Sequence, residues 1–283
     1  MDNNMDVKDK FVTALLDDIS NNRLVLPTLP EVALKVRKVV NDPCVTADKL
    51  SKLIGTDAAL SARLLQVANS VFFKGLNPVQ NVHTAVVRLG MVCVRNVVTS
   101  LVMNQLYQAK KNASIKKELQ ALWIHGAKVA AISNILAKRY TPLNSDEAML
   151  GGLVHDIGIL PILSRAVDFP DIIGNKEVLD EVIAEMHPNI GKLILEGWHF
   201  PQELVDVAAE HENLQYNPGE QATYTDVVII ANLHSYLGKT DRPAVDWGAV
   251  QAFEKLSLTP EKSIAMLAEA QAEIMDIQRL LIS

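Results

Sequence analysis

Residues 117–136, KELQALWIHGAKVAAISNIL, carry the pattern that decides the fold. Their apolar side chains recur every three or four positions, at Leu119, Leu122, Val129, Ile132 and Leu136. An α-helix has about 3.6 residues per turn, so these positions share one face of a helix that is buried against other helices. The same spacing dominates the rest of the chain, and strict alternation is almost absent. The sequence therefore predicts an all-α protein.

Capping residues indicate where several helices begin. Thr46 and Asn144 are expected to cap helices, and further helices are expected after Asp57 and Asn81. Glu147 follows Asn144 at the spacing of a capping pair. Proline is favoured in the first turn of a helix, so we expect a helix to begin at Pro188, directly after His187.

The chain is long enough for two packed helical subdomains. Lysines at positions 110, 111, 116 and 117 interrupt the apolar pattern, so we expect the subdomains to be residues 1–112 and 113–283. Residues 1–110 carry 13 basic and 9 acidic side chains, and the remaining residues carry 14 basic and 24 acidic ones. The acidic second half argues against broad binding to nucleic acids or anionic membranes, because both attract positive charge.

Other features of the composition indicate a cytoplasmic protein. No run of about 18 uncharged apolar residues could span a bilayer. The N-terminus has acidic residues where a secretory peptide would have a basic region and then an apolar run. Cys44 and Cys93 lack metal-ligand spacing, so we expect free thiols in a reducing compartment.

Several polar residues occupy helical positions where the pattern calls for apolar ones. They are His125, His187, His211 and Asn232. Each alone is explained as a hydrogen-bonded core residue, because buried polar groups normally find partners. Taken together with the adjacent pair His155 and Asp156, they indicate a shared polar centre.

The pair His155-Asp156 could contribute to a metal site. Neighbouring residues lie roughly 100° apart around a helix, so the ring nitrogen and the carboxylate could share one cation. Such ligands suit iron, manganese or zinc, which lower the pKa of a bound water for attack on phosphorus. An isolated His-Asp pair is at least as often structural, so the pair alone is a weak signal.

The ordered series resembles the HD superfamily of metal-dependent phosphohydrolases: His125, His155-Asp156, His187, His211 and Asn232. The resemblance implies metal ligands of the types His, His-Asp and a late Asp, with extra histidines for a second metal in some branches. Asn232 stands where the late Asp is expected. Further stretches resemble the second half of that domain: His187-Pro-Asn-Ile-Gly191, Trp198, Phe200-Pro201 and Glu210-His211-Glu212.

Motifs in the first half are similar to those of the HDOD branch: Leu26-Pro-Thr-Leu-Pro30, Asp57-Ala-Ala-Leu-Ser-Ala-Arg-Leu-Leu65, Ala68-Asn-Ser70 and Ala85-Val-Val-Arg-Leu-Gly90. The resemblance spans residues 21–215 and implies a bacterial, helical, signalling-related protein, in a family generally without demonstrated catalysis. Asn69, Ser70 and Arg88 belong to these motifs, but their role is unknown. Read by themselves, they indicate a cap or turn and a solvated cation.

The centre departs from that of active relatives. Asn232 removes a negative charge, which beside a divalent ion is worth several kcal/mol before desolvation. Ile159 stands where active relatives commonly have lysine, and His211 is followed by neither a second histidine nor a Gly-Tyr-Pro element. We therefore expect no hydrolysis of cyclic di-GMP and no cofactor. The alternative is one weakly bound divalent metal, Fe, Mn or Zn.

Three functional hypotheses follow. The first is a non-catalytic signal-transduction module that binds a protein partner or a small ligand. The second is a residual metal-dependent phosphohydrolase that acts on a nucleotide or a phosphomonoester, and bound metal separates these two. The third takes Thr46–Ala68 as a helix-turn-helix DNA reader, but Arg63 and Lys74 offer too few phosphate contacts. We expect no membrane partner.

Overall fold

The computed structural model describes residues 2–21, 23–24, 27, 31–40, 42, 45–70, 73, 75, 77–108, 113–237 and 245–282. Within these ranges every regular element is a helix and no strand occurs, so the predicted all-α class is confirmed. Several residues named above lie outside the described ranges: Leu26, Pro30, Cys44, Lys74, Lys110 and Lys111. Residue 112, at the expected subdomain boundary, lies outside them as well.

The helices of the first segment are α1 (Asp2–Ser20), α2 (Glu31–Val40), α3 (Ala47–Gly55), α4 (Ala58–Ala68), α5 (Val82–Leu89) and α6 (Met91–Leu106). Those that follow are η1 (Ala113–Ile115), α7 (Lys116–Tyr140), α8 (Ser145–Val154), α9 (Ile159–Ala166), α10 (Pro170–Ile173), α11 (Lys176–Gly197), α12 (Gln202–Glu210) and α13 (Tyr224–Ser235). The chain ends with η2 (Trp247–Ala249), α14 (Gln251–Lys255), α15 (Pro260–Glu269) and α16 (Gln271–Ile282).

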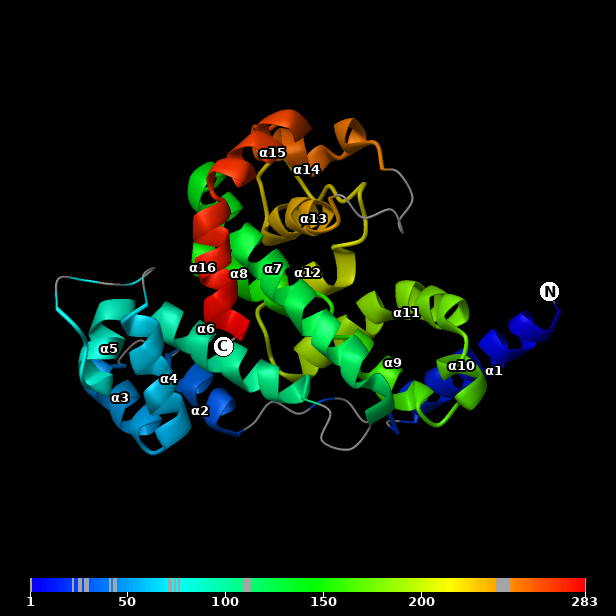
Figure 1. Cartoon of the computed structure of the whole chain (residues 1–283), viewed down its shortest axis with the longest axis horizontal. Helices are drawn as coiled ribbons and strands as arrows, with labels where there is room; N and C mark the ends of the chain where they lie inside the picture. The colour runs from blue at the N-terminus through cyan, green and yellow to red at the C-terminus, as the bar shows by residue number, and fades with distance from the viewer. Residues whose placement is uncertain are drawn as a thin grey trace.

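The long helix α7 runs through the middle of the molecule, and α8, α13 and α16 pack against it (Figure 1). Helices α2 to α5 gather on one side of α7. Gly152 of α8 permits the close approach of α8 to α7, because a Cβ at this position would lie 2.8 Å from backbone atoms of Ala130. By length and composition the stretch Ser145–Ala166 could cross a membrane, but 83% of its most apolar window is buried inside the fold, as in a core helix.

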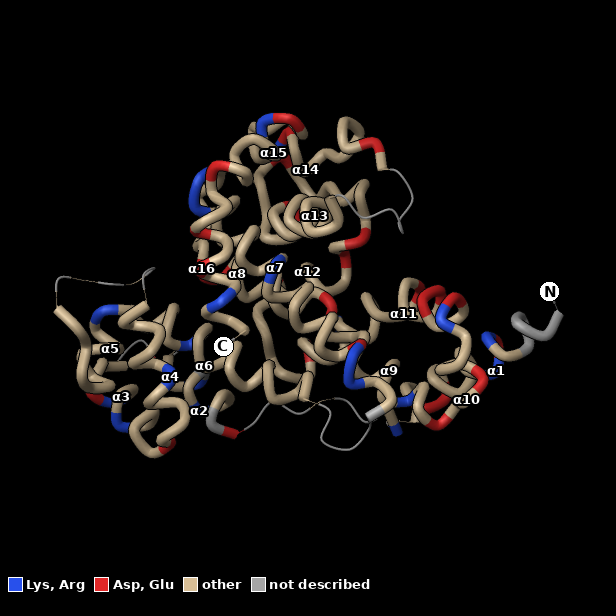
Figure 2. The backbone as a smooth tube through the Cα atoms, in the orientation of Figure 1, with Lys and Arg blue, Asp and Glu red and all other residues tan. Residues whose placement is uncertain are grey.

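Helix α1 lies at the far end of the molecule from α2 to α5 and packs on α9, α10 and α11 (Figure 1). The ring of Phe11 meets that of Phe169 edge-on, with 5.0 Å between their centroids. Asp18 accepts a hydrogen bond from Arg165 at 2.8 Å. Acidic and basic positions lie beside each other in this region (Figure 2). The division into two subdomains after residue 112 stays a prediction. Helix α1, which belongs to the first expected subdomain, packs on α9, α10 and α11 of the second.

The predicted N-caps Thr46 and Asn144 are confirmed, since each side chain accepts a backbone N–H of the first turn. The helices expected after Asp57 and Asn81 are present, and these two side chains cap them in the same way. The side chain of Glu147 forms an ion pair with Arg95 of α6.

The helix start predicted at Pro188 is wrong, because Pro188 lies inside the continuous helix α11. Proline costs the helix one hydrogen bond. Here the helix continues on both sides because it is held by packing, with Val182 and Ile190 buried in the core.

Candidate metal centre

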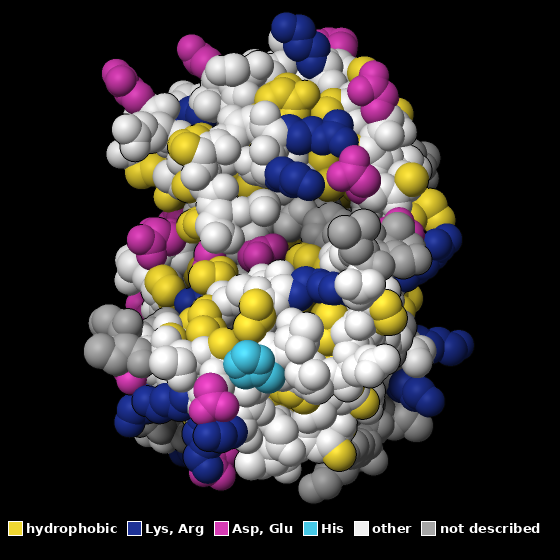
Figure 3. Space-filling model, turned by 90° about the vertical axis from the view of Figure 1, so that its left-hand side faces the viewer, with side chains coloured by type: hydrophobic (Ala, Val, Ile, Leu, Met, Phe, Trp, Pro, Cys, Tyr) yellow, Lys and Arg dark blue, Asp and Glu magenta, His cyan; other side chains and the backbone are white. Residues whose placement is uncertain are grey.

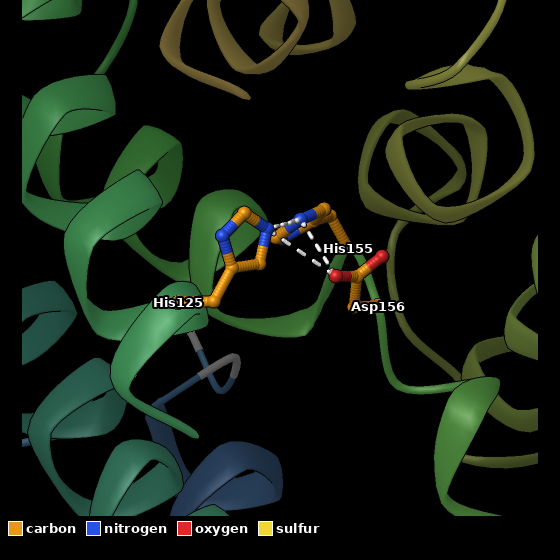
Figure 4. Close-up of side chains that lie close together, drawn as sticks. All are labelled: His125, His155 and Asp156. Carbon is orange, nitrogen blue, oxygen red and sulfur yellow. Dashed lines mark hydrogen bonds and ion pairs between the residues drawn. The ribbon is translucent and has the colours of Figure 1, made fainter. Parts of the chain in front are cut away.

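The structure brings five of the predicted site residues together, although they come from four parts of the chain. His125 lies on α7, and His155 caps the C-terminus of α8 with Asp156 directly after it. Figure 4 shows these three side chains pointing toward one another. His187 lies on α11, and His211 caps the C-terminus of α12. The five side chains thus meet where α7, α8, α11 and α12 converge.

The carboxylate of Asp156 lies at the middle of this cluster. Its Oδ2 atom is 3.4 Å from Nε2 of His125 and 3.2 Å from Nε2 of His155. Its Oδ1 atom is 3.4 Å from Nε2 of His187 and 3.3 Å from Nε2 of His211. Each carboxylate oxygen therefore lies next to one pair of histidines. The possible ligand atoms form two groups that share Asp156, one with His125 and His155 and the other with His187 and His211.

The other ring nitrogen of each histidine fixes its tautomer. Nδ1 of His155 donates to the backbone carbonyl of Gly152 at 2.7 Å, and Nδ1 of His187 donates to that of Ile183, also at 2.7 Å. Nδ1 of His211 lies 3.1 Å from the carbonyl of Val207. A carbonyl only accepts, so Nδ1 carries the proton and Nε2 of the neutral ring presents a lone pair to the centre.

His125 follows the same rule through a hydroxyl. Oγ of Ser235 donates to the carbonyl of Asn232 at 2.7 Å and lies 3.4 Å from Nδ1 of His125. Because the hydroxyl proton is already used, Oγ accepts from Nδ1. When neutral, each of the four rings therefore presents an unprotonated Nε2 atom to the centre.

Within each pair of histidines the two Nε2 atoms lie so close that their lone pairs would repel each other unless a positive charge lay between them. They are 3.2 Å apart in the pair His125 and His155, and 3.1 Å apart in the pair His187 and His211. Two acceptors cannot hydrogen-bond to each other, so each pair requires a proton or a metal ion. Imidazole and carboxylate donors suit Fe, Mn and Zn.

Burial and neighbouring charges act on the protonation of the cluster. Burial opposes ionisation of Asp156, but His155, His211 and His125 outweigh it and hold the pKa of this carboxyl well below its usual range. Burial opposes the charged form of His155, but the attraction of Asp156 outweighs it and raises the pKa of His155. Burial, reinforced by repulsion from His211, lowers the pKa of His187. The carboxylate therefore stays anionic and favours positive charge beside it.

Gly158 positions the His-Asp turn against α11. A Cβ at this residue would lie 2.0 Å from the carbonyl oxygen of His187 and 2.6 Å from the backbone nitrogen of Gly191. Both of these atoms belong to the backbone and cannot rotate away. The absence of a side chain at Gly158 therefore lets Asp156 reach the histidine of α11.

Asn232 lies on α13, and its side chain is directed to a carboxylate that the sequence analysis missed. Its Nδ2 atom donates to Oε1 of Glu212 at 3.4 Å, and the same oxygen lies 3.9 Å from Nε2 of His211. Oδ1 of Asn232 is buried and has no hydrogen-bond partner within the described part of the chain. The only sequence signal for Glu212 was its position next to His211.

The motif residues lie away from the centre: Asn69 is the C-cap of α4, Ser70 follows it, and Arg88 lies on α5. Figure 1 shows α4 and α5 in the other part of the molecule. The amide of Asn69 pairs with both backbone groups of Val79, at 2.8 Å and 2.7 Å. Arg88 donates to the carbonyls of Ala68 and Asn77, so its reading as a solvated cation is wrong. Oγ of Ser70 is buried without a partner among the described residues. Asn69 and Arg88 therefore hold the segment between α4 and α5.

Comparison with solved structures shows similar folds. A candidate metal-dependent phosphohydrolase from Shewanella amazonensis is 28% identical and superposes with a TM-score of 0.78 over 98% of this chain and 99% of that one. An HDOD domain protein of unknown function from Geobacter sulfurreducens is 22% identical, with a TM-score of 0.67 over 99% and 97% of the two chains. For a candidate signal transduction protein from Marinobacter aquaeolei the identity is 21% and the TM-score 0.66, over 93% of this chain and 61% of that one.

Sequence comparison gives the family. An uncharacterised protein from Treponema pallidum is 24% identical over an alignment of 238 residues. The match covers 79% of this chain but only 44% of that relative, so this chain spans less than half the length of that protein. The family model of the HDOD domain matches residues 26–214. This chain therefore belongs to the HDOD domain family.

Proposed function

We propose that this HDOD protein is a non-catalytic signal-transduction module that contains a metal ion and acts through a protein partner or a small ligand. The observation that carries the proposal is an enclosed set of donors. Four Nε2 atoms and one carboxylate converge, while the side chain of Asp156 is only 10% exposed and that of His125 12%. A cation fits among these atoms, and these two side chains present little surface to a phosphoester.

The residues present fit a divalent metal. His125, His155 and Asp156 would hold an ion in one half of the centre, and Asp156, His187 and His211 would hold one in the other. A bound metal would act as a Lewis acid. Hydrogen bonds at Nδ1 of His155, His187 and His211 turn their Nε2 atoms toward the centre, and Asp156 is held ionised, which is the form of a carboxyl group that binds metal.

Three features support a role without catalysis. The ring of Tyr236 packs on that of His125, with 5.0 Å between centroids, and its hydroxyl lies 3.4 Å from the Nε2 atom that would face a metal. Asn232 contributes no charge. Ile159 is uncharged, whereas other enzymes stabilise a transferring phosphoryl group with a cationic side chain. Substrate binding would need Tyr236 to move.

The second candidate is a metal-dependent phosphohydrolase. One observation favours it: Asp156 contacts both histidine pairs, so it could bridge two metal ions, an arrangement used for phosphate-ester hydrolysis. The name of the Shewanella relative points in the same direction.

DNA binding is not part of the proposal. Arg63, the basic residue of α4, donates to the carbonyl of Leu280 at the end of α16. On the face shown in Figure 3, basic and acidic side chains are interspersed, whereas DNA binding calls for a continuous basic surface.

The first experiment measures bound metal. The untagged protein would be purified without chelator, and iron, manganese, zinc and nickel would be counted by plasma mass spectrometry. We expect near-stoichiometric metal in the wild type, only traces in His155→Ala, and wild-type content in His83→Ala, which removes an exposed histidine of α5. Traces in the wild type would refute the metal centre.

A second experiment separates the two candidates. The metal-loaded protein would be incubated with p-nitrophenyl phosphate and with bis(p-nitrophenyl) phosphate. We expect no turnover above that of His155→Ala. Turnover that depends on His155 would refute the non-catalytic role and support the phosphohydrolase.

A further inference from the structure

We infer that Glu212 supplies the anionic metal ligand that position 232 lacks. The inference rests on the proposed metal centre and names one more of its ligands. Oε1 of Glu212 lies 3.9 Å from Nε2 of His211 and 3.4 Å from Nδ2 of Asn232. The carboxylate thus stands between the amide and the histidine pair of α11 and α12.

The distance to His211 is compatible with a shared ion. A histidine nitrogen binds zinc at about 2.0 to 2.1 Å and a carboxylate oxygen at about 2.0 to 2.2 Å, so the two ligand atoms of one ion are at most about 4.3 Å apart. The 3.9 Å between Glu212 and His211 falls within that limit. Glu212 follows the C-cap of α12, and its side chain is 37% exposed, which leaves it room to turn toward an ion.

The orientation of Asn232 supports the same assignment. An ionised carboxylate only accepts hydrogen bonds, so the NH₂ group of Asn232 has to face Glu212. This orientation explains why Oδ1 of Asn232 is left buried and without a partner in the described residues. A carboxylate at position 232 would instead place two negative charges side by side. Asn232 therefore orients a ligand from outside, as hydrogen-bonding neighbours do at many metal sites.

Glu212 adds a second carboxylate beside the histidine pair of α11 and α12, because its Oε1 atom lies 3.9 Å from Nε2 of His211. A carboxylate so close to these ring nitrogens attracts a metal ion to the same place. The centre consequently keeps two carboxylates, Asp156 and Glu212, despite the asparagine at position 232.

The test is a calorimetric titration of Mn²⁺ into the full, untagged, chelator-treated chain. Manganese is chosen because carboxylate ligands contribute most to the binding of hard ions. Glu212→Gln removes the charge and keeps the shape. Glu210→Gln is the matched control, since it makes the same change two residues earlier, where Glu210 accepts from Asn213 at 2.9 Å.

We expect Glu212→Gln to weaken Mn²⁺ binding at least about 10-fold, the low end for changes in outer-shell partners of a metal. Glu210→Gln should leave the affinity unchanged. The double variant Glu212→Gln and Asn232→Asp should regain the affinity, because the negative charge lost at position 212 returns at position 232, its hydrogen-bonding partner. Thermal melting of the metal-free variants checks that each one folds like the wild type.

The outcomes are distinguishable. Wild-type affinity in Glu212→Gln would overturn the role of Glu212 and leave the metal centre intact. Failure of Asn232→Asp to restore binding would overturn the claim that the two positions supply one charge. If the wild type binds no Mn²⁺ and contains no metal when purified, the proposed centre itself fails.

Discussion

The substitution Gly158→Ala tests how the His-Asp turn is held against α11. The added methyl would lie 2.0 Å from the carbonyl oxygen of His187, far inside van der Waals contact. The φ of Gly158 is −66°, so alanine meets no conformational penalty and the effect is purely steric. Overpacking typically costs 1 to 3 kcal/mol, and a clash with backbone cannot be relieved by a rotamer change. We therefore expect a loss of about 3 kcal/mol.

The assay is urea unfolding followed by circular dichroism, together with Mn²⁺ titration. The matched control is Gly197→Ala at the end of α11, where an added Cβ meets nothing within 4 Å. That variant should be neutral or more stable by up to about 1 kcal/mol, because alanine favours helix. Moving the turn away from α11 should also separate Asp156 from His187 and weaken metal binding. Stability of Gly158→Ala within about 0.5 kcal/mol of the wild type would refute the close packing.

Three further predictions concern other parts of the molecule. Asn69→Ala should cost about 1 to 3 kcal/mol in urea unfolding, because it leaves both backbone groups of Val79 without partners; unchanged hydrogen exchange at the Val79 amide would contradict this. Phe11→Ala should cost about 3 to 5 kcal/mol, whereas Leu16→Ala, at a residue 52% exposed on the same helix, should cost little; equal effects would show that α1 is not packed as described. Burial, with a smaller contribution from Lys128, lowers the pKa of His234 to about 4. An unfolded histidine titrates near pH 6.5, so the unfolded state binds more protons between these values. Unfolding free energy should then fall by up to about 3 kcal/mol as the pH falls from about 6.5 to 4. His234→Gln should reduce this slope in urea unfolding at a series of pH values, and an unchanged slope would refute the assignment.

Features set by neighbouring residues could be predicted from the sequence. Thr46 and Asn144 cap their helices because a short polar side chain reaches a backbone N–H two or three residues ahead. The apolar positions of residues 117–136 predicted α7 for the same reason, because helical periodicity depends only on residues close together in the sequence. Pro188 shows the limit, since its local preference for a helix start is overridden by the packing of α11.

The centre itself could be predicted only in part. His125, His187 and His211 were identified because polar residues at apolar positions call for partners, His155 and Asp156 because they are adjacent, and the whole series because it resembles the HD superfamily. Which atoms face inward depends on the carbonyls that fix Nδ1, and these depend on the tertiary structure. Arg88 was misread for a similar reason, because its acceptors lie 11 and 20 positions away. Glu212 could not be found, since nothing in the sequence shows that it lies beside Asn232.

Charge balance in the centre favours one metal ion over two. A buried site tolerates little net charge, because desolvation of an unpaired ion costs several kcal/mol. Asp156 and Glu212 supply two negative charges, and histidines that bind metal are neutral. One divalent ion, together with the proton that the pair His125 and His155 would then require, would leave an excess of one positive charge, whereas two ions would leave an excess of two. Glu212 lies beside His211, so Asp156, His187 and His211 are the residues that would hold a single ion.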